Sequence, residues 1–365
     1  MGFKCGIVGL PNVGKSTLFN ALSKGQAKIG NFPFTTIEPN IAIVGVPDER
    51  LYKIAKIVNA RLITPTTIEF VDIAGLVRGA SKGEGLGNQF LAQIRNVDAI
   101  AFVVRCFSDD NVVHISGDID PVEDISVVKM ELILADLEII QKVREGLAKK
   151  VKVGEKDIKH KLELADDINN RLSRGEWLYN IYSNEEQEVI KEYNLLTVKP
   201  CMYVANIDEA TLFNINGNSF LKSLEEHLSA ENDRIIKISC KLENELSELE
   251  NDERIEFLKS YNLTGSALEG LVQKGYKILN LATFFTAGEK ETKAWTVKLG
   301  TNALDAAGLI HSDIKKGFIR AEVVDYETFM RLGGFSAISK EGKLRLEGKD
   351  YIIQDGDIIY FRFNV

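Results

Sequence analysis

The chain has 365 residues, of which 45% are hydrophobic, and its formal net charge is −8. This length allows two or three domains with full cores. The negative charge argues against general coating of nucleic acid, although an acidic chain can still carry a local basic patch. No run of 18 or more apolar residues occurs, and no charged leader precedes the first apolar segment, so we expect a cytoplasmic protein without a membrane partner.

Apolar runs in chain order predict a sheet of mainly parallel strands. The run at residues 3–10 ends in a glycine-rich loop, and residues 15–24 then follow helical spacing. Segments long enough for helices separate most of the later runs, which favours an α/β, doubly wound arrangement. The predicted later strands lie at residues 40–46, 66–74, 99–107, 200–207 and 234–240.

Two further regions have patterns of apolar residues that differ from those of the predicted sheet. From Ile125 the apolar residues recur at helical spacing, and "SNEEQEVIKEY" opens with a Ser183/Glu186 capping box, so we expect an inserted helical hairpin at residues 125–196. Short alternating runs with glycine turns predict a small β-rich domain at residues 283–365. The sheet domain would then comprise residues 1–124 and 197–282.

The stretch "GLPNVGKST", Gly9 to Thr17, fits the pattern G-x-x-x-x-G-K-[ST] between a predicted strand and a predicted helix. Glycines let successive backbone N–H groups point inward, and the helix start adds its positive dipole end, so this loop is suited to wrapping a phosphate. Lys15 would meet the β- and γ-phosphates and act in catalysis, and the Ser16 hydroxyl would hold Mg²⁺. The predicted phosphate-binding residues are Asn12, Val13, Gly14, Lys15, Ser16 and Thr17.

Two later segments match the regions that sense Mg²⁺ and the γ-phosphate in switch proteins. "NFPFTTIEP" supplies Thr36 as a metal ligand, and "EFVDIAGL" places Asp72 at a strand end, where it would bind Mg²⁺ through water. Switch GTPases usually carry a glutamine after the glycine of the second segment, but this chain has Leu76, which cannot polarise water. His114 is the candidate that could orient the attacking water instead, with a surface or packing histidine as the alternative.

The loop "NIDE" at residues 206–209 occupies the position at which guanine-binding proteins carry the N-K-x-D sequence. Asn206 is kept, Ile207 replaces the lysine, and Glu209 replaces the aspartate with one methylene more. The aspartate of a guanine reader accepts from N1–H and the 2-amino group, donors that adenine lacks, whereas Asn206 could pair with the N7 and N6 edge of adenine. Ser239 and Cys240 in "KISCKLE" complete the predicted base side of the site.

With these motifs and the tail "FFTAGEKETKAW", the sequence resembles the Obg-like ATPase (YchF) family along essentially its whole length. The resemblance implies a P-loop domain of the translation-factor class, an inserted coiled coil and a C-terminal TGS domain of β-grasp fold. It implies ATP preferred over GTP through Asn206 to Glu209, with backbone groups at Ile207 contributing, and slow ATPase activity with His114 as the catalytic histidine. It also implies ribosome binding and a need for K⁺. This need is consistent with Asn12, whose side-chain oxygen in the phosphate loop could help to coordinate a monovalent cation beside the phosphates.

The segment at residues 142–161 carries eight Lys and Arg against three Asp and Glu, and it would project from the predicted hairpin. We expect it to track RNA phosphates on the ribosome or its subunits, although a solvated helix face is the alternative. We expect a monomer that hydrolyses ATP and whose nucleotide state controls ribosome binding. Two other hypotheses are an Obg-like GTPase of ribosome assembly and a nucleotide-gated RNA-binding scaffold with incidental turnover.

Overall fold

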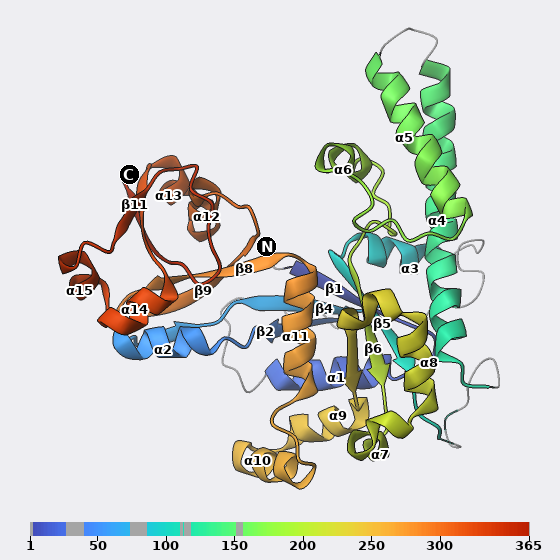
Figure 1. The fold of residues 1–365 in the computed structure, drawn as a ribbon, viewed down its shortest axis with the longest axis horizontal. Helices are drawn as coiled ribbons and strands as arrows, with labels where there is room; N and C mark the ends of the chain where they lie inside the picture. Colours follow the sequence, from blue (N-terminus) through green and yellow to red (C-terminus); the bar gives the residue numbers. More distant parts are fainter. Residues whose placement is uncertain are drawn as a thin grey trace. The chain divides into compact units, whose positions relative to one another are not determined.

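The computed structural model describes residues 3–26, 40–73, 86–109, 112, 118–150 and 156–364. The chain divides into two compact units (Figure 1). The first unit comprises Met1–Val44 and Glu69–Leu271, and the second comprises Gly45–Ile68 and Val272–Val365.

The first unit contains a six-stranded sheet in the order β2-β4-β1-β5-β6-β7. β1 pairs with β5, β5 with β6, and β6 with β7, all in parallel, so these four strands end at one edge of the sheet. This arrangement confirms the predicted α/β fold with a mainly parallel sheet. The strands are β1 (Phe3–Val8), β2 (Ile41–Gly45), β4 (Thr67–Asp72), β5 (Ala99–Arg105), β6 (Cys201–Asn206) and β7 (Ile235–Ile238).

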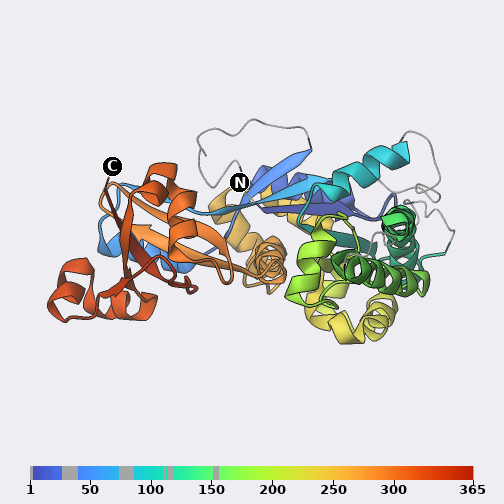
Figure 2. The same ribbon diagram turned by 90° about the horizontal axis from the view of Figure 1, so that it is seen from above.

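The central strands consist largely of apolar residues, and helices lie on both sides of the sheet (Figure 2). Every residue of β5 and β6 is buried, as expected for parallel strands that are covered on both faces. Helix α1 (Lys15–Gln26) packs against α9 (Cys240–Glu248), and α8 (Ser219–His227) packs against α4 (Pro121–Lys150). The other helices of this unit are α3 (Leu86–Arg95), α7 (Glu209–Phe213) and α10 (Asn251–Ser260), and α11 (Ala267–Ile278) leads into the second unit.

Two long helices form the insertion between β5 and β6. α4 packs along α5 (Lys156–Ser173), and buried residues such as Ile133, Ile140 and Ile168 lie between them (Figure 1). α6 (Asn184–Lys191) begins with the predicted capping box, since Ser183 accepts from the Glu186 N–H and Glu186 accepts from the Ser183 N–H. Among the described residues, no helix combines the length and the apolar character needed to cross a membrane.

The second unit is built on a sheet in the order β11-β10-β12-β8-β9-β3. β8 and β9 form an antiparallel hairpin, and β12 pairs with β8 in parallel. The predicted β-rich C-terminal region is therefore present, with four short helices added: α12 (Ala303–Ile310), α13 (Ser312–Lys316), α14 (Tyr326–Leu332) and α15 (Phe335–Lys340). The strands are β3 (Leu62–Thr64), β8 (Leu281–Ala287), β9 (Glu291–Lys298), β10 (Phe318–Val324), β11 (Arg345–Glu347) and β12 (Ile358–Phe363).

One stretch of the predicted sheet domain belongs to the second unit. Residues 45–68 fall within the predicted boundaries 1–124 but cluster with the C-terminal residues. The physical reason is that α2 (Glu49–Ile57) buries Leu51 and Ile54 against Phe285, and β3 extends the sheet by pairing with β9. The hydrophobic pattern could not predict that residues 45–68 belong to the second unit. The sequence of an amphipathic helix reveals an apolar face, but it does not reveal which core that face packs against.

All four cysteines are buried and free. Burial raises the pKa of the thiols of Cys5, Cys106, Cys201 and Cys240. These side chains are therefore neutral at physiological pH, and they act as small hydrophobic groups.

Candidate nucleotide-binding site

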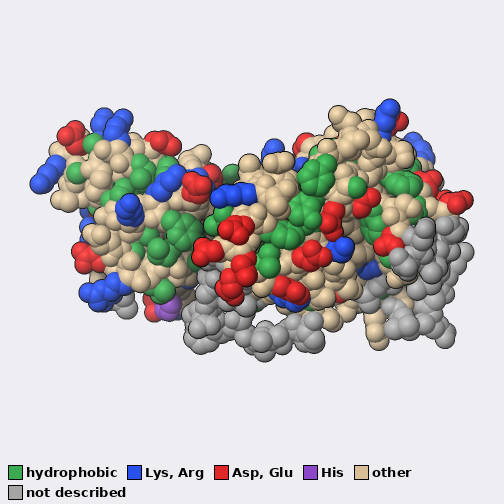
Figure 3. All heavy atoms as spheres, turned by 90° about the horizontal axis from the view of Figure 1, so that it is seen from below, with side chains coloured by type: hydrophobic (Ala, Val, Ile, Leu, Met, Phe, Trp, Pro, Cys, Tyr) green, Lys and Arg blue, Asp and Glu red, His purple; other side chains and the backbone are tan. Residues whose placement is uncertain are grey.

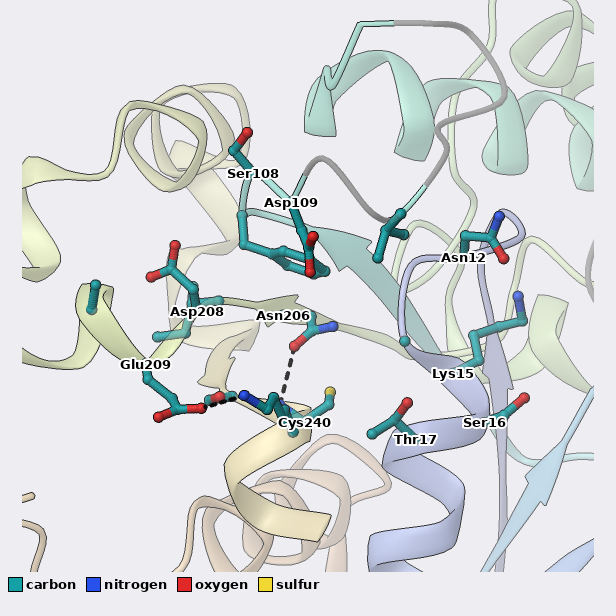
Figure 4. Close-up of a pocket in the computed structure, with 17 residues that line it drawn as sticks. Asn12, Lys15, Ser16, Thr17, Ser108, Asp109, Asn206, Asp208, Glu209 and Cys240 are labelled. Carbon is teal, nitrogen blue, oxygen red and sulfur yellow. Dashed lines mark hydrogen bonds and ion pairs between the residues drawn. The ribbon is translucent and has the colours of Figure 1, made fainter. Parts of the chain in front are cut away.

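A cavity of about 690 Å³ lies at the edge where β1, β5, β6 and β7 end (Figure 4). Ligands of open α/β sheets bind at the carboxyl ends of the strands, and the volume suits a small organic ligand. Four loops that are far apart in sequence meet here, one after each strand. Of the residues predicted from the sequence, the cavity is lined by Asn12, Gly14, Lys15, Ser16, Thr17, Asn206, Ile207, Glu209, Ser239 and Cys240.

The loop after β1 is held in a tight curl by its backbone conformation. Asn12 has φ 64° and Gly14 has φ 102°, both in the left-handed region that glycine and asparagine adopt most readily. Gly9 lies so close to β5 that an added Cβ would be 2.5 Å from the Val103 carbonyl oxygen. The loop then passes into α1, whose first residue is Lys15, so its backbone and a helix N-terminus face the cavity together.

Lys15 closes this loop with its side chain. Its Nζ donates a hydrogen bond of 2.7 Å to the carbonyl oxygen of Leu10, and the residue is only 8% exposed. Burial lowers the pKa of Lys15 to about 8, and the negative charge of Asp72 opposes this shift. Burial in turn raises the pKa of Asp72, and Lys15 opposes that rise. A buried ammonium group that hydrogen-bonds a neutral carbonyl oxygen is suited to receive a phosphate.

Asn206 joins three of the loops through its side-chain amide. Its Nδ2 donates to the carbonyl oxygen of Val13 at 2.9 Å, and its Oδ1 accepts from the backbone N–H of Cys240 at 3.1 Å (Figure 4). The residue is 5% exposed, so these bonds are shielded from water. Both ends of the amide are thus engaged with the backbone, which favours a positioning role for Asn206 over the predicted reading of an adenine edge.

Ile207 and Glu209, which replace the lysine and the aspartate of guanine readers, have surroundings that differ from each other. Ile207 is 2% exposed, and its N–H donates to the carbonyl oxygen of Ile238. Its side chain and its amide therefore both stabilise the local fold. Glu209 begins α7, where Asp208 is the N-cap, and its carboxylate accepts from the Tyr261 hydroxyl and pairs with Lys241. These contacts lower the pKa of Glu209 and keep it ionised.

The loop after β7 ends at the N-terminus of α9. Ser239 is the N-cap, and its side chain accepts from the Leu242 N–H. The Cys240 thiol lines the cavity, and burial keeps it neutral. Both residues are therefore present at the site, although the Ser239 side chain is used in capping the helix.

The predicted metal and catalytic residues are only partly described. Ser16 lines the cavity, and Asp72 ends β4, where its charge acts on Lys15. Thr36, Leu76 and His114 lie outside the described residues. In the part of the chain that the structure describes, no three His, Cys, Asp or Glu side chains gather into a metal cluster. Ser16 and Asp72 still fit Mg²⁺, which is usually held by one or two protein groups together with phosphates and water.

The loop after β5 contributes one wall of the cavity, and from this loop the sequence suggested only His114. Arg105 is 1% exposed, and its guanidinium donates to the carbonyl oxygens of Phe107, Asp109 and Val112. A buried cation therefore fixes the backbone that presents this wall. The sequence signal for this loop was the position of its residues directly after a predicted strand of the sheet. The cavity residues not predicted are Phe107, Ser108, Asp109, Val112, Asp208, Ala210 and Lys241.

Comparison with known proteins agrees with this geometry. A family model described as 50S ribosome-binding GTPase matches residues 4–143, and the model YchF-GTPase_C, described as a protein of unknown function, matches residues 281–364. The ribosome-binding ATPase YchF of Haemophilus influenzae is 50% identical over 366 residues, and that of Bacillus subtilis is 47% identical, each alignment covering 100% of both chains.

A solved structure is similar over nearly the whole chain. The structure of the Schizosaccharomyces pombe YchF GTPase matches with a TM-score of 0.90 at 36% identity, covering 99% of this chain and 98% of that one. The full-length identity to curated relatives, the two family models and this shared architecture agree. The chain therefore belongs to the YchF family of P-loop proteins.

Proposed function

We propose that this protein binds ATP and hydrolyses it slowly to ADP and phosphate, and that the bound nucleotide controls its association with the ribosome. The observation that carries the proposal is one cavity that joins a phosphate loop to a base-side loop lacking the lysine and aspartate of guanine readers. Relatives that are about half identical over their full length are named ribosome-binding ATPases.

The base side of the cavity suits adenine better than guanine. Guanine offers N1–H and a 2-amino group to a carboxylate, but the Glu209 carboxylate is already engaged by Tyr261 and Lys241. Adenine needs no carboxylate there, since it presents the N1 acceptor and the N6 amino donor. Ile207 lines the cavity where guanine readers carry lysine, and its carbonyl is a group that can accept from N6.

In the proposed mechanism, water attacks the γ-phosphate in line with the leaving ADP oxygen. The Lys15 ammonium contacts the β- and γ-phosphates and stabilises the charge that develops on them. Ser16, Thr36 and Asp72 would hold Mg²⁺, which neutralises phosphate charge when bound. The Asn12 side-chain oxygen would help hold K⁺ beside the phosphates.

His114 is proposed to orient the attacking water, because Leu76 stands where switch GTPases carry a glutamine. His114→Ala is expected to lower turnover by about 10²-fold, while the affinity for ATP stays the same. Single-turnover hydrolysis and equilibrium titration separate these two quantities. Unchanged turnover would remove His114 from the mechanism.

The pKa of Lys15 predicts that ATP binding takes up protons near pH 8. In the free protein the pKa is lowered to about 8, so about half of the Lys15 side chains are neutral at that pH. A bound triphosphate favours the charged form, so about half a proton should be taken up at pH 8 and almost none at pH 6. Titration calorimetry in two buffers of different ionisation enthalpy measures this uptake. Lys15→Met should abolish it, whereas uptake that persists in the variant would come from another group.

The inserted hairpin is the proposed contact with ribosomal RNA, together with the C-terminal unit that corresponds to the predicted TGS domain of residues 283–365. Lys142, Lys149, Lys150 and Lys159 are exposed near the ends of α4 and α5. Exposed lysines on a hairpin can bind phosphates without reading bases, so the association should weaken as salt rises. We place the protein in the cytoplasm as a monomer for this function.

Calorimetric titration with ATP and with GTP, in Mg²⁺ and K⁺, tests the proposal. We expect ATP to bind tighter by about tenfold, or ~1.4 kcal/mol. Equal or tighter binding of GTP would favour an Obg-like GTPase of ribosome assembly. The name of the Schizosaccharomyces pombe relative supports that second candidate.

A further inference from the structure

Tyr261 is linked to the base side of the cavity by a hydrogen bond and by ring stacking. Its hydroxyl donates to Oε2 of Glu209 at 2.9 Å, although the two residues lie 52 positions apart. Its ring stacks on Phe213 with centroids 5.6 Å apart, and it contacts the ring of Phe257 at 5.1 Å. Phe213 is the last residue of α7, the short helix that begins at Glu209. Tyr261 therefore holds α7 at both ends.

Lys241 engages the other oxygen of the same carboxylate. Its Nζ lies 3.1 Å from Oε1 of Glu209, and Figure 4 shows the Glu209 side chain turned toward the start of α9. The Lys241 side chain is 76% exposed and that of Glu209 31% exposed, so this ion pair alone is weak. Since the Tyr261 hydroxyl is held by a stacked ring, it is the stronger of the two contacts.

We infer that Tyr261 and Lys241 are positioning residues that set the base specificity of the site by engaging both oxygens of the Glu209 carboxylate. This inference rests on the proposed function, in which the cavity prefers ATP. A guanine base would have to draw the carboxylate away from these partners or share its oxygens with them. The specificity thus depends on residues outside the "NIDE" loop as well as on the loop itself.

The same contacts also favour adenine. Adenine presents N1 as a hydrogen-bond acceptor, and an ionised carboxylate that turned toward it would be repelled because neither group has a proton to donate. Engaging both oxygens of Glu209 holds this negative charge toward Tyr261 and Lys241. Release of the carboxylate should therefore strengthen GTP binding and weaken ATP binding.

The aromatic stack lies at the surface, where substitutions should leave the fold intact. Phe213 is 62% exposed, and Phe257 and Tyr261 are half-buried. Figure 3 views the face that carries α10 and shows hydrophobic side chains beside acidic ones. Tyr261→Phe keeps the stacked ring and removes only the hydroxyl, so it isolates the hydrogen bond to Glu209.

The test is titration calorimetry of ATP and GTP with the full chain and its variants. Tyr261→Phe should lower the ratio of ATP to GTP affinity about fivefold, Lys241→Met should lower it less, and the double variant should lower it most. Tyr182→Phe is the matched control, because its hydroxyl donates to Asp167 at 3.0 Å in the inserted helices, and its ratio should not change.

Three outcomes would overturn the inference. A ratio unchanged in the double variant means that Tyr261 and Lys241 do not set specificity. An equal loss of affinity for both nucleotides means that they only support the fold. Preference of the unsubstituted protein for GTP overturns the proposed function itself, and with it the basis of the inference, so this failure is distinguished before any variant is measured.

Discussion

Replacing Lys15 by methionine is expected to lower ATP hydrolysis by about 10²- to 10³-fold, the usual cost of losing one group that stabilises transition-state charge. Lys15 sits at the start of α1 and is 8% exposed. Its Nζ donates to the carbonyl oxygen of Leu10, a partner that a phosphate can displace. Methionine keeps most of the length of the side chain and removes its charge, so we expect the substitution to lower the rate of hydrolysis. Phosphate release under saturating ATP measures the change.

Lys24→Met is the matched control for this experiment. Lys24 lies in the last turn of the same helix, where its Nζ pairs with Glu248 at 2.6 Å on the surface. The control should hydrolyse ATP at the normal rate, since the pair is exposed and distant from the phosphate loop. Equal activity of Lys15→Met and Lys24→Met would contradict the assignment of the phosphate loop as the catalytic element.

The Lys15 variant also separates an enzyme from a scaffold. If nucleotide turnover drives the function, loss of hydrolysis should change how the protein cosediments with ribosomes in the presence of ATP. If hydrolysis is lost while ribosome association and function in the cell are unchanged, turnover is incidental, and the protein is a nucleotide-gated binding scaffold.

The phosphate loop could be predicted because its signals are local in the sequence. Gly9, Gly14 and Lys15 occur at fixed spacing between an apolar run and a helical pattern, and the structure places them as that spacing requires. The same local reasoning found the capping box at Ser183. Contacts within a few residues are encoded by spacing alone.

The roles of Asn206 and Glu209 could not be predicted because their partners come from distant segments. Asn206 bonds to Val13, which is 193 positions away, and Glu209 bonds to Tyr261 after α10. The sequence suggested that Asn206 faces the base, yet burial directs its amide to the backbone of two other loops. A side chain that can make several equivalent hydrogen bonds is assigned only when the fold shows which groups surround it.

Replacing Gly14 by alanine is expected to destabilise the first unit by about 2–5 kcal/mol and to abolish nucleotide binding. Gly14 has φ 102°, which strains any residue with a Cβ, and the added atom would lie 2.3 Å from Nδ2 of Asn206. Asn206 would have to move, and the buried carbonyl of Val13 would lose its donor. Urea unfolding of the nucleotide-free protein measures the loss of stability, and calorimetry measures the loss of binding.

Gly175→Ala separates the two causes, because Gly175 lies in the same unit with φ 78° and has nothing within 4 Å of an added Cβ. It should cost only the backbone strain, about 1–2 kcal/mol, and leave nucleotide binding intact. The difference between the variants then measures the contact between the phosphate loop and Asn206. Equal losses of unfolding free energy in the two variants would mean that Asn206 can move without loss of stability. Its amide would then not couple the phosphate loop to the base-side loop. A larger loss at Gly14 would mean that displacing the buried Asn206 amide costs stability, because this amide bonds both the phosphate loop and the loop after β7.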